Sequence, residues 1–103
     1  YTGYCVQPQT GAANVVGSES PKGDGRYGQS DLAGNVSEWV LDHYASYVSP
    51  CNDCVEYADT FMRMARGGSF NSPAAVLHST LRGTTDGALR SVMFGARCAR
   101  APE

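Results

Sequence analysis

The sequence has no long hydrophobic run, and its charges nearly balance. Its longest apolar stretches are only a few residues, whereas a membrane-spanning helix needs about 20, so no membrane span is expected. The formal net charge of −2 provides no long-range field for nucleic acid or an anionic membrane, so no nucleic-acid partner is expected. Also missing are a His-Glu-x-x-His zinc motif, a Gly-x-Ser-x-Gly nucleophile elbow and a glycine-rich phosphate loop that enters a helix.

Residues that bend the chain are abundant instead. The 103 residues include 12 Gly and 5 Pro, which indicates frequent turns. A hydrophobic content of 42 % is too high for a disordered chain with so little net charge, so we expect a folded, loop-rich protein. A chain of this size buries only roughly 60–65 % of its unfolded surface, so the core should be thin. Because the chain begins at Tyr1 without an initiator Met, we interpret it as part of a longer protein.

The basic residues are almost all arginine, with Lys22 as the exception. Arginine offers five N–H donors in a planar fork, which suits both loop carbonyls and carboxylates. Two interpretations therefore stay open: arginines that hold loops in place, and a dedicated anion-binding site.

Short alternating segments predict a few strands and little helix. Residues 36–41 alternate well enough for a strand with Val36, Trp39 and Val40 in the core, and residues 61–66 predict a second strand, ended by Gly67-Gly68. Weaker signals predict a short strand at Val15-Val16, a short helix or strand within 73–82, a turn over 84–87, and a closing strand within 91–99 with a bulge at Gly95. Residues 42–60 predict a long loop, which a metal ion or Cys51 and Cys54 would have to hold.

Three motifs occur in order along the chain. They are Tyr27-Gly28-Gln29-Ser30-Asp31-Leu32-Ala33-Gly34-Asn35-Val36-Ser37-Glu38-Trp39, then Arg66-Gly67-Gly68-Ser69-Phe70, then Gly95-Ala96-Arg97-Cys98-Ala99-Arg100. Their order and spacing resemble the C-terminal half of formylglycine-generating-enzyme domains, the sulfatase-modifying factors. The resemblance implies a low-regularity α+β fold related to C-type lectins, with short strands and long loops. It also implies that residues 1–103 are the C-terminal portion of a single domain whose remainder lies upstream.

The first motif places oxygen-bearing side chains around a Gly34-Asn35 turn, and Ca²⁺ prefers oxygen ligands. The resembling family binds structural calcium at this segment. Carried over by position, Asp31 and Glu38 would supply side-chain oxygens, while Gly34 and Val36 would supply main-chain carbonyls. The alternative needs no metal: Asp31 caps the turn, and Glu38 pairs with an arginine such as Arg66 or Arg97.

Active members of the resembling family oxidise a substrate cysteine to formylglycine, using oxygen and copper(I) bound by two cysteines that follow the Gly-Gly-Ser motif. Here no Cys occurs between Cys54 and Cys98, and Ser72 and Leu77 stand near the two expected positions. Because Cu(I) prefers soft thiolate ligands, a hydroxyl and an isobutyl group predict that copper is not bound. His78 alone more often serves as a surface or packed residue than as a ligand.

The four cysteines are Cys5, Cys51, Cys54 and Cys98. In a small, loop-rich chain they favour disulfides, and hence a secreted or periplasmic location, but three pairings are possible. Cys51-Asn52-Asp53-Cys54 could also be half of a zinc site or a redox pair, although it lacks the second Cys pair or the helix that those functions require.

Two functions remain from these observations. The first is a non-catalytic binding or structural module that is stabilised by calcium and disulfides and displays loops at 42–60 and 71–90 to a protein or peptide ligand. The alternative is an oxidoreductase of the formylglycine-generating type that acts on a cysteine-bearing protein or peptide.

Overall fold

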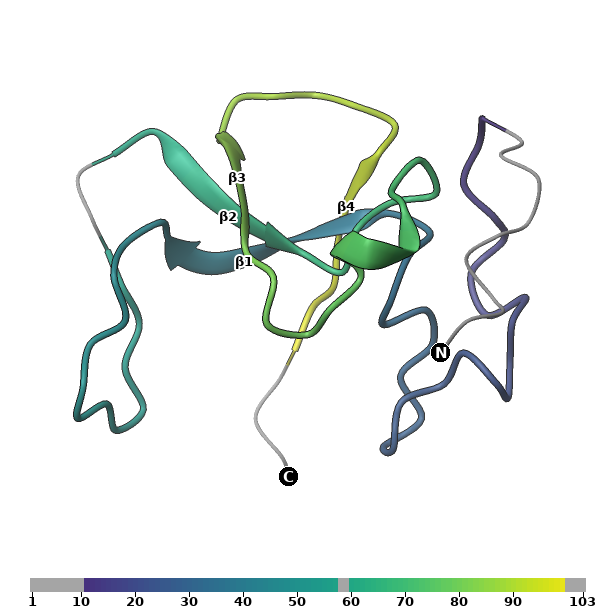
Figure 1. Ribbon diagram of the computed structural model, residues 1–103, viewed down its shortest axis with the longest axis horizontal. Coiled ribbons are helices and arrows are strands. Elements are labelled where there is room, and N and C mark those ends of the chain that lie inside the picture. The colour runs from purple at the N-terminus through teal and green to yellow at the C-terminus, as the bar shows by residue number, and fades with distance from the viewer. Residues whose placement is uncertain (1–10, 58–59, 100–103) are drawn as a thin grey trace.

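A four-stranded mixed sheet forms the centre of the chain in the computed structural model, which describes residues 11–57 and 60–99 (Figure 1). The strands are β1 (Ser37–His43), β2 (Met62–Arg66), β3 (Gly83–Asp86) and β4 (Phe94–Ala96), in the order β3-β2-β1-β4. β2 pairs antiparallel with both β1 and β3, whereas β4 pairs parallel with β1. The one helix of the described residues is the short 3-10 helix η1 (Ala74–Val76). This low-regularity α+β arrangement agrees with the predicted class.

Both strongly predicted strands are confirmed. Turn residues mark the start of β1 and the end of β2, as expected. Gly34 and Asn35 have φ angles of 89° and 62°, a left-handed bend that leads into β1. Gly67 and Gly68 have φ angles of 87° and 68° and turn the chain away after β2. Most residues with a Cβ are disfavoured at such angles, so the glycines and Asn35 indicated where β1 begins and where β2 ends.

Two weaker predictions were wrong, and a third, the closing strand within 91–99, is confirmed only as the short strand β4. Val15 and Val16 form no strand; they lie in a turn region, 81 % and 80 % exposed, and no segment of the described residues pairs with them. The predicted turn at 84–87 is mostly β3, which β2 holds in register. The closing strand is only three residues long, and Gly95 pairs in regular register with Glu38, so the bulge there is absent; the irregularity lies in β1 between Trp39 and His43.

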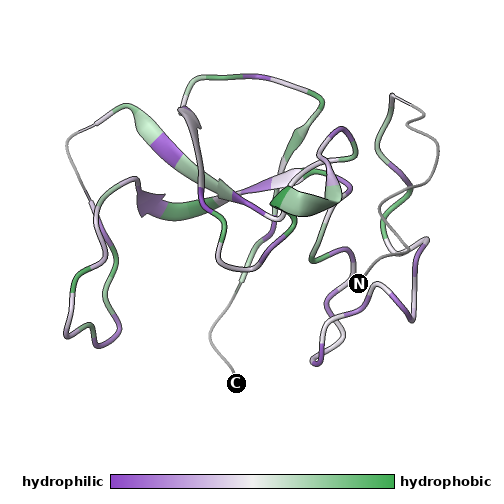
Figure 2. Cartoon of the chain, viewed as in Figure 1, coloured by the Kyte–Doolittle hydropathy of each residue, from purple (hydrophilic) through white to green (hydrophobic). Residues whose placement is uncertain are grey.

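The hydrophobic core is thin, as the length of the chain predicts. Among the described residues, Met64 and Ala65 of β2 are the buried hydrophobic side chains. Trp39 is half-buried and stacks on Phe94 of β4 with ring centroids 5.0 Å apart, so it does contribute to the core. Figure 2 shows hydrophobic residues spread over strands and loops alike. No helix in the described part of the chain has the length and apolar character to cross a bilayer.

The long loop predicted at 42–60 is confirmed for residues 44–57 and 60; its first two residues belong to β1, and residues 58–59 lie outside the described residues. Its return end is tied to β1, since the Glu56 N–H donates to Asp42 Oδ1 and the His43 N–H donates to the Glu56 carbonyl, both at 2.9 Å. A disulfide joins Cys51 to Cys54 within the loop. Residues 44–57 and residues 11–30 lie on opposite sides of the sheet (Figure 1).

Candidate functional site

The three sequence motifs come together at one end of β1. The Gly34 N–H donates to the Gly67 carbonyl and the Phe70 N–H donates to the Asn35 carbonyl, both at 2.7 Å. The third motif joins them through the parallel pairing of β4 with β1. Segments that are far apart in sequence thus share one hydrogen-bonded junction.

Polar side chains of the first motif hold the segment that precedes it. Asp31 Oδ2 accepts a hydrogen bond from the Gly17 N–H at 2.7 Å. The Asn35 amide exchanges two hydrogen bonds with the main chain of Asn14, at 2.8 and 3.3 Å. Asp31 itself has a φ of 54°, a conformation that Asp tolerates better than most residues. These contacts give Asp31 a structural partner other than a metal.

Glu38 pairs with Arg97, one of the two arginines considered from the sequence. Arg97 Nε lies 3.1 and 2.9 Å from the two carboxylate oxygens, and Nη2 lies 2.6 Å from Oε1 and 2.7 Å from the Ser30 carbonyl. The hydrogen bonds with Glu38 raise the pKa of Arg97, partial burial acts against this, and the charges of Glu38 and Asp31 raise it further. Arg97 is therefore a permanent cation beside both of the predicted acidic calcium ligands.

The predicted calcium ligands lie around the left-handed turn, and Arg97 competes for one of them, Glu38. Asp31, Gly34, Val36 and Glu38 flank the left-handed turn, whose bend can direct carbonyls to one side. However, calcium would have to share Glu38 with Arg97. Within residues 11–57 and 60–99, no three His, Cys, Asp or Glu side chains gather closely enough to hold a metal ion, so carbonyls and water would complete any calcium shell. Calcium at this turn stays a prediction.

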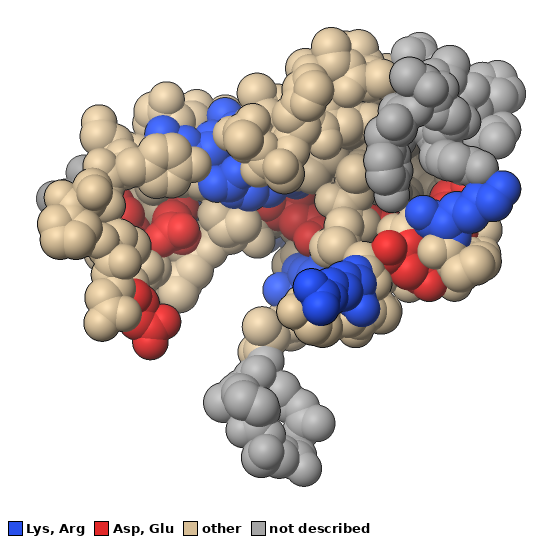
Figure 3. Space-filling view, turned by 60° about the horizontal axis from the view of Figure 1, so that its bottom comes forward, with Lys and Arg blue, Asp and Glu red and all other residues tan. Residues whose placement is uncertain are grey.

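Arginines hold loops in place, as one of the two sequence interpretations predicted. Arg66 donates to the carbonyls of Ser79 and Leu81, at 2.9 and 3.1 Å, and to the Tyr47 hydroxyl at 3.2 Å. Arg82 donates to the Ala45 carbonyl at 2.8 Å. Its guanidinium also lies over two aromatic rings of the loop, those of Tyr47 at 3.9 Å and Tyr44 at 5.1 Å. On the face seen in Figure 3, acidic and basic side chains are interspersed.

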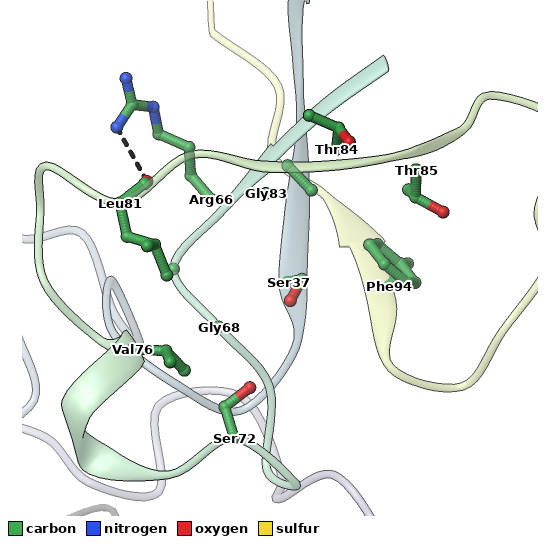
Figure 4. A pocket seen from close by; sticks show the side chains of 12 residues that line it. Ser37, Arg66, Gly68, Ser72, Val76, Leu81, Gly83, Thr84, Thr85 and Phe94 are labelled. Atoms are coloured by element: carbon green, nitrogen blue, oxygen red, sulfur yellow. Dashed lines mark hydrogen bonds between the residues drawn. The ribbon is translucent and has the colours of Figure 1, made fainter. Parts of the chain in front are cut away.

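A pocket of about 280 Å³ lies beside the second motif (Figure 4). It spans the sheet and the segments that follow Gly67-Gly68 and η1. Its lining residues are Ser37, Ala65, Arg66, Gly67, Gly68, Ser72, Val76, Leu81, Gly83, Thr84, Thr85 and Phe94. Sequence reasoning missed this pocket, because its floor depends on which residues of β2 and β3 face each other.

Ser72 and Leu77, which stand near the expected cysteine positions, serve the local packing. The Ser72 hydroxyl accepts a hydrogen bond from the Ser69 N–H at 2.9 Å and lies 3.3 Å from the buried Ser69 hydroxyl. Leu77 lies against Gly68, where an added Cβ would come within 2.5 Å of its Cδ2. A hydroxyl engaged in a turn and an aliphatic side chain do not fit copper(I), which prefers thiolates.

The structure shows the bonding state of three of the four cysteines. Cys51 and Cys54 form a disulfide, which selects one of the three interpretations of that pair. Cys98 is exposed and carries a free thiol, while Cys5 lies outside the described residues. His78 is exposed at the surface, as expected for a lone histidine.

Comparisons with known proteins agree with the motif analysis. The family model described as "Sulfatase-modifying factor enzyme 1-like domain" matches residues 4–102. None of the curated proteins matches the chain. Among solved structures, the chain is similar to variable protein 1 of Treponema denticola, with a TM-score of 0.73 and 27 % sequence identity. The similarity covers 84 % of this chain and 31 % of the Treponema protein, so the chain spans about a third of that protein's length.

Proposed function

The chain belongs to the family of sulfatase-modifying factor enzyme 1-like domains, and from that premise we propose that it is a non-catalytic module of this family that binds a protein or peptide. The observation that supports the proposal most directly is that the side chains of Ser72 and Leu77 make local packing contacts. Both stand where the resemblance places the copper-binding cysteines, yet one hydroxyl holds the 69–72 turn and the isobutyl group packs against Gly68. None of the described residues that line the adjacent pocket carries a thiol.

Binding, rather than a purely architectural role, is supported by what the scaffold displays. The loop over residues 44–57 is held by a disulfide, by Glu56 and by Arg82, so it presents a defined surface without regular secondary structure. Functional loops on a rigid scaffold can vary while the core stays the same. The solved Treponema protein to which the chain is similar is named a variable protein.

Three further properties belong to the same proposal. The chain is the C-terminal portion of one domain, whose remainder lies upstream. It works outside the cytoplasm, where a disulfide such as Cys51–Cys54 persists. Structural calcium binds at Asp31, Gly34, Val36 and Glu38 and stabilises the junction of the three motifs.

Calcium is expected to raise the melting temperature of the protein. A ligand present at about 100 times its Kd adds about 2.7 kcal/mol to the free energy of unfolding, and removal of calcium with EDTA should reverse the effect. Thermal unfolding should be followed with calcium, with magnesium as the control cation, and with EDTA. Asp31→Asn should abolish the response, and a melting temperature that ignores all three additions would remove calcium from the proposal.

The absence of catalysis is tested directly with a cysteine-bearing sulfatase-type peptide, copper and oxygen. We expect no aldehyde product by mass spectrometry, because neither Ser72 nor Leu77 can bind copper(I) as thiolates do. An active formylglycine-generating enzyme serves as the positive control. Aldehyde formation by the full-length parent of this chain would favour the alternative, an oxidoreductase acting on a cysteine-bearing substrate, and would overturn our proposal.

A further inference from the structure

The floor of the pocket is made by two residues with almost no side chain. Ala65 of β2 faces Gly83 of β3 across the antiparallel pair, and Trp39 of β1 faces Ala65 on the other side. Because side chains alternate along a strand, Thr85 and Ser37 lie on the same sheet face as these residues. The small pair leaves room on this face beside Thr85 and Phe94, which also line the pocket.

The walls are held by contacts that do not depend on a ligand. Arg66 donates to the Leu81 carbonyl, which fixes the main chain of this lining residue, and Figure 4 shows the guanidinium turned away from Phe94 and Thr85. On the other side, the Ser69–Ser72 turn fixes Ser72. The pocket is therefore preformed, and filling it requires little ordering of the protein.

The lining is uncharged toward the interior of the pocket. Among the described residues that line it, none is acidic, and the one basic residue, Arg66, already donates to two carbonyls and a hydroxyl. Aliphatic and aromatic surface comes from Val76, Leu81 and Phe94. A charged group placed here would lose its hydration without gaining a partner of opposite sign, whereas an apolar group would gain by leaving water.

The size of the pocket and the adjoining strand point to the form of the ligand. Its volume of about 280 Å³ lies just below the range of about 300–1,000 Å³ that is usual for complete small-molecule ligands. β3, which contributes Gly83, Thr84 and Thr85, lies at the edge of the sheet formed by the described residues. An extended peptide can add to such an edge through main-chain hydrogen bonds and place alternate side chains in neighbouring pockets.

We propose that an extended segment of a partner protein pairs with the outer edge of β3, the edge strand of the described residues, and inserts one uncharged apolar side chain, of leucine or phenylalanine size, into this pocket. The inference rests on the proposed binding function and names its site and ligand class. The main chain supplies general affinity, and the Ala65–Gly83 floor supplies the preference for an apolar residue.

The test uses capped pentapeptides with threonine at every position except a central residue, which is Leu, Phe, Gly, Asp or Lys. Binding to the chain is measured by NMR titration. The Leu and Phe peptides should bind about 10- to 100-fold more tightly than the others, as burial of one large apolar side chain predicts. Gly83→Leu should weaken their binding at least as much as replacing the central residue with Gly, because the new side chain fills the floor.

Gly83 is suited to this substitution, since its φ is not in the left-handed region and the nearest atom to an added Cβ is the Ala65 carbonyl oxygen at 3.5 Å. Leu81→Ala, which widens the opening, should shift the preference from Leu toward Phe, a change that unfolding cannot mimic. Three results would each overturn the inference. The five peptides could bind equally, none of them could bind, or the Gly83→Leu variant could bind the Leu and Phe peptides as tightly as the original chain. If a ligand still bound elsewhere, the general binding function would survive.

The same titration on the full-length parent separates a partner from the protein's own chain. Peptide binding by both forms supports the proposal. Binding by this chain alone would assign the pocket to the upstream part of the domain and overturn it. Aldehyde formation in the oxidation assay, by contrast, would overturn the proposed function itself.

Discussion

Replacing Met64 with alanine is expected to lower the free energy of unfolding by about 3 kcal/mol, within the range found when large core side chains are truncated. Met64 is only 4 % exposed, and it is one of two hydrophobic side chains buried among the described residues. A cavity in so thin a core has few neighbours that could relax into it. Since total stabilities of about 5–15 kcal/mol are usual, this loss should be plain in urea denaturation.

Met62→Ala is the matched control for this prediction. It makes the same chemical change two residues earlier on β2, where the side chain is 40 % exposed. The expected loss is about 1 kcal/mol or less, since less apolar surface returns to water. Equal losses from the two variants would show that the core does not lie along β2 as described.

Gly68→Ala is expected to cost about 3 kcal/mol, for two reasons that add. The φ of 68° is unfavourable for a residue with a Cβ, by roughly 1–2 kcal/mol. The new Cβ would also lie 2.5 Å from Leu77 Cδ2 and 3.4 Å from Ser72 Cβ, so a packed neighbour must move, and such overpacking costs typically about 1–3 kcal/mol. Chemical denaturation measures the total.

Gly28→Ala separates the two reasons. Gly28 has a similar left-handed φ of 81°, but nothing lies within 4 Å of an added Cβ. Its expected loss is therefore the backbone part alone, roughly 1–2 kcal/mol. If Gly28→Ala were as damaging as Gly68→Ala, crowding against Leu77 would play no part and the packing of the second motif would need revision.

Gly68→Ala also connects stability with binding, because Gly68 and Ser72 both line the pocket. Movement of Leu77 or of the 69–72 turn would change the wall opposite Arg66. A variant that remains folded but binds the leucine pentapeptide more weakly would link the second motif to recognition as well as to the fold.

Turn chemistry was readable from the sequence where a single residue type controls it. The start of β1 follows from Gly34 and Asn35, and the end of β2 follows from Gly67 and Gly68, since a left-handed backbone strongly favours glycine or asparagine. β3 was missed because Thr-Thr-Asp-Gly has turn composition, and pairing with β2 overrides that local preference. Val15-Val16 shows the reverse case: a β-branched pair forms no strand without a neighbour to pair with.

The motifs alone were enough to identify the family and the low-regularity class of fold. Their glycines and short polar side chains determine turns through contacts between residues that are close in sequence. They could not identify the partner of Glu38, since Arg97 lies 59 residues away and Arg66 was an equal candidate. The pocket could not be predicted from the sequence either, because Ala65 and Gly83 are brought together only by the register of β2 with β3. Such pairings arise when distant strands align, and strand alignment depends on packing across the whole sheet rather than on the preferences of neighbouring residues.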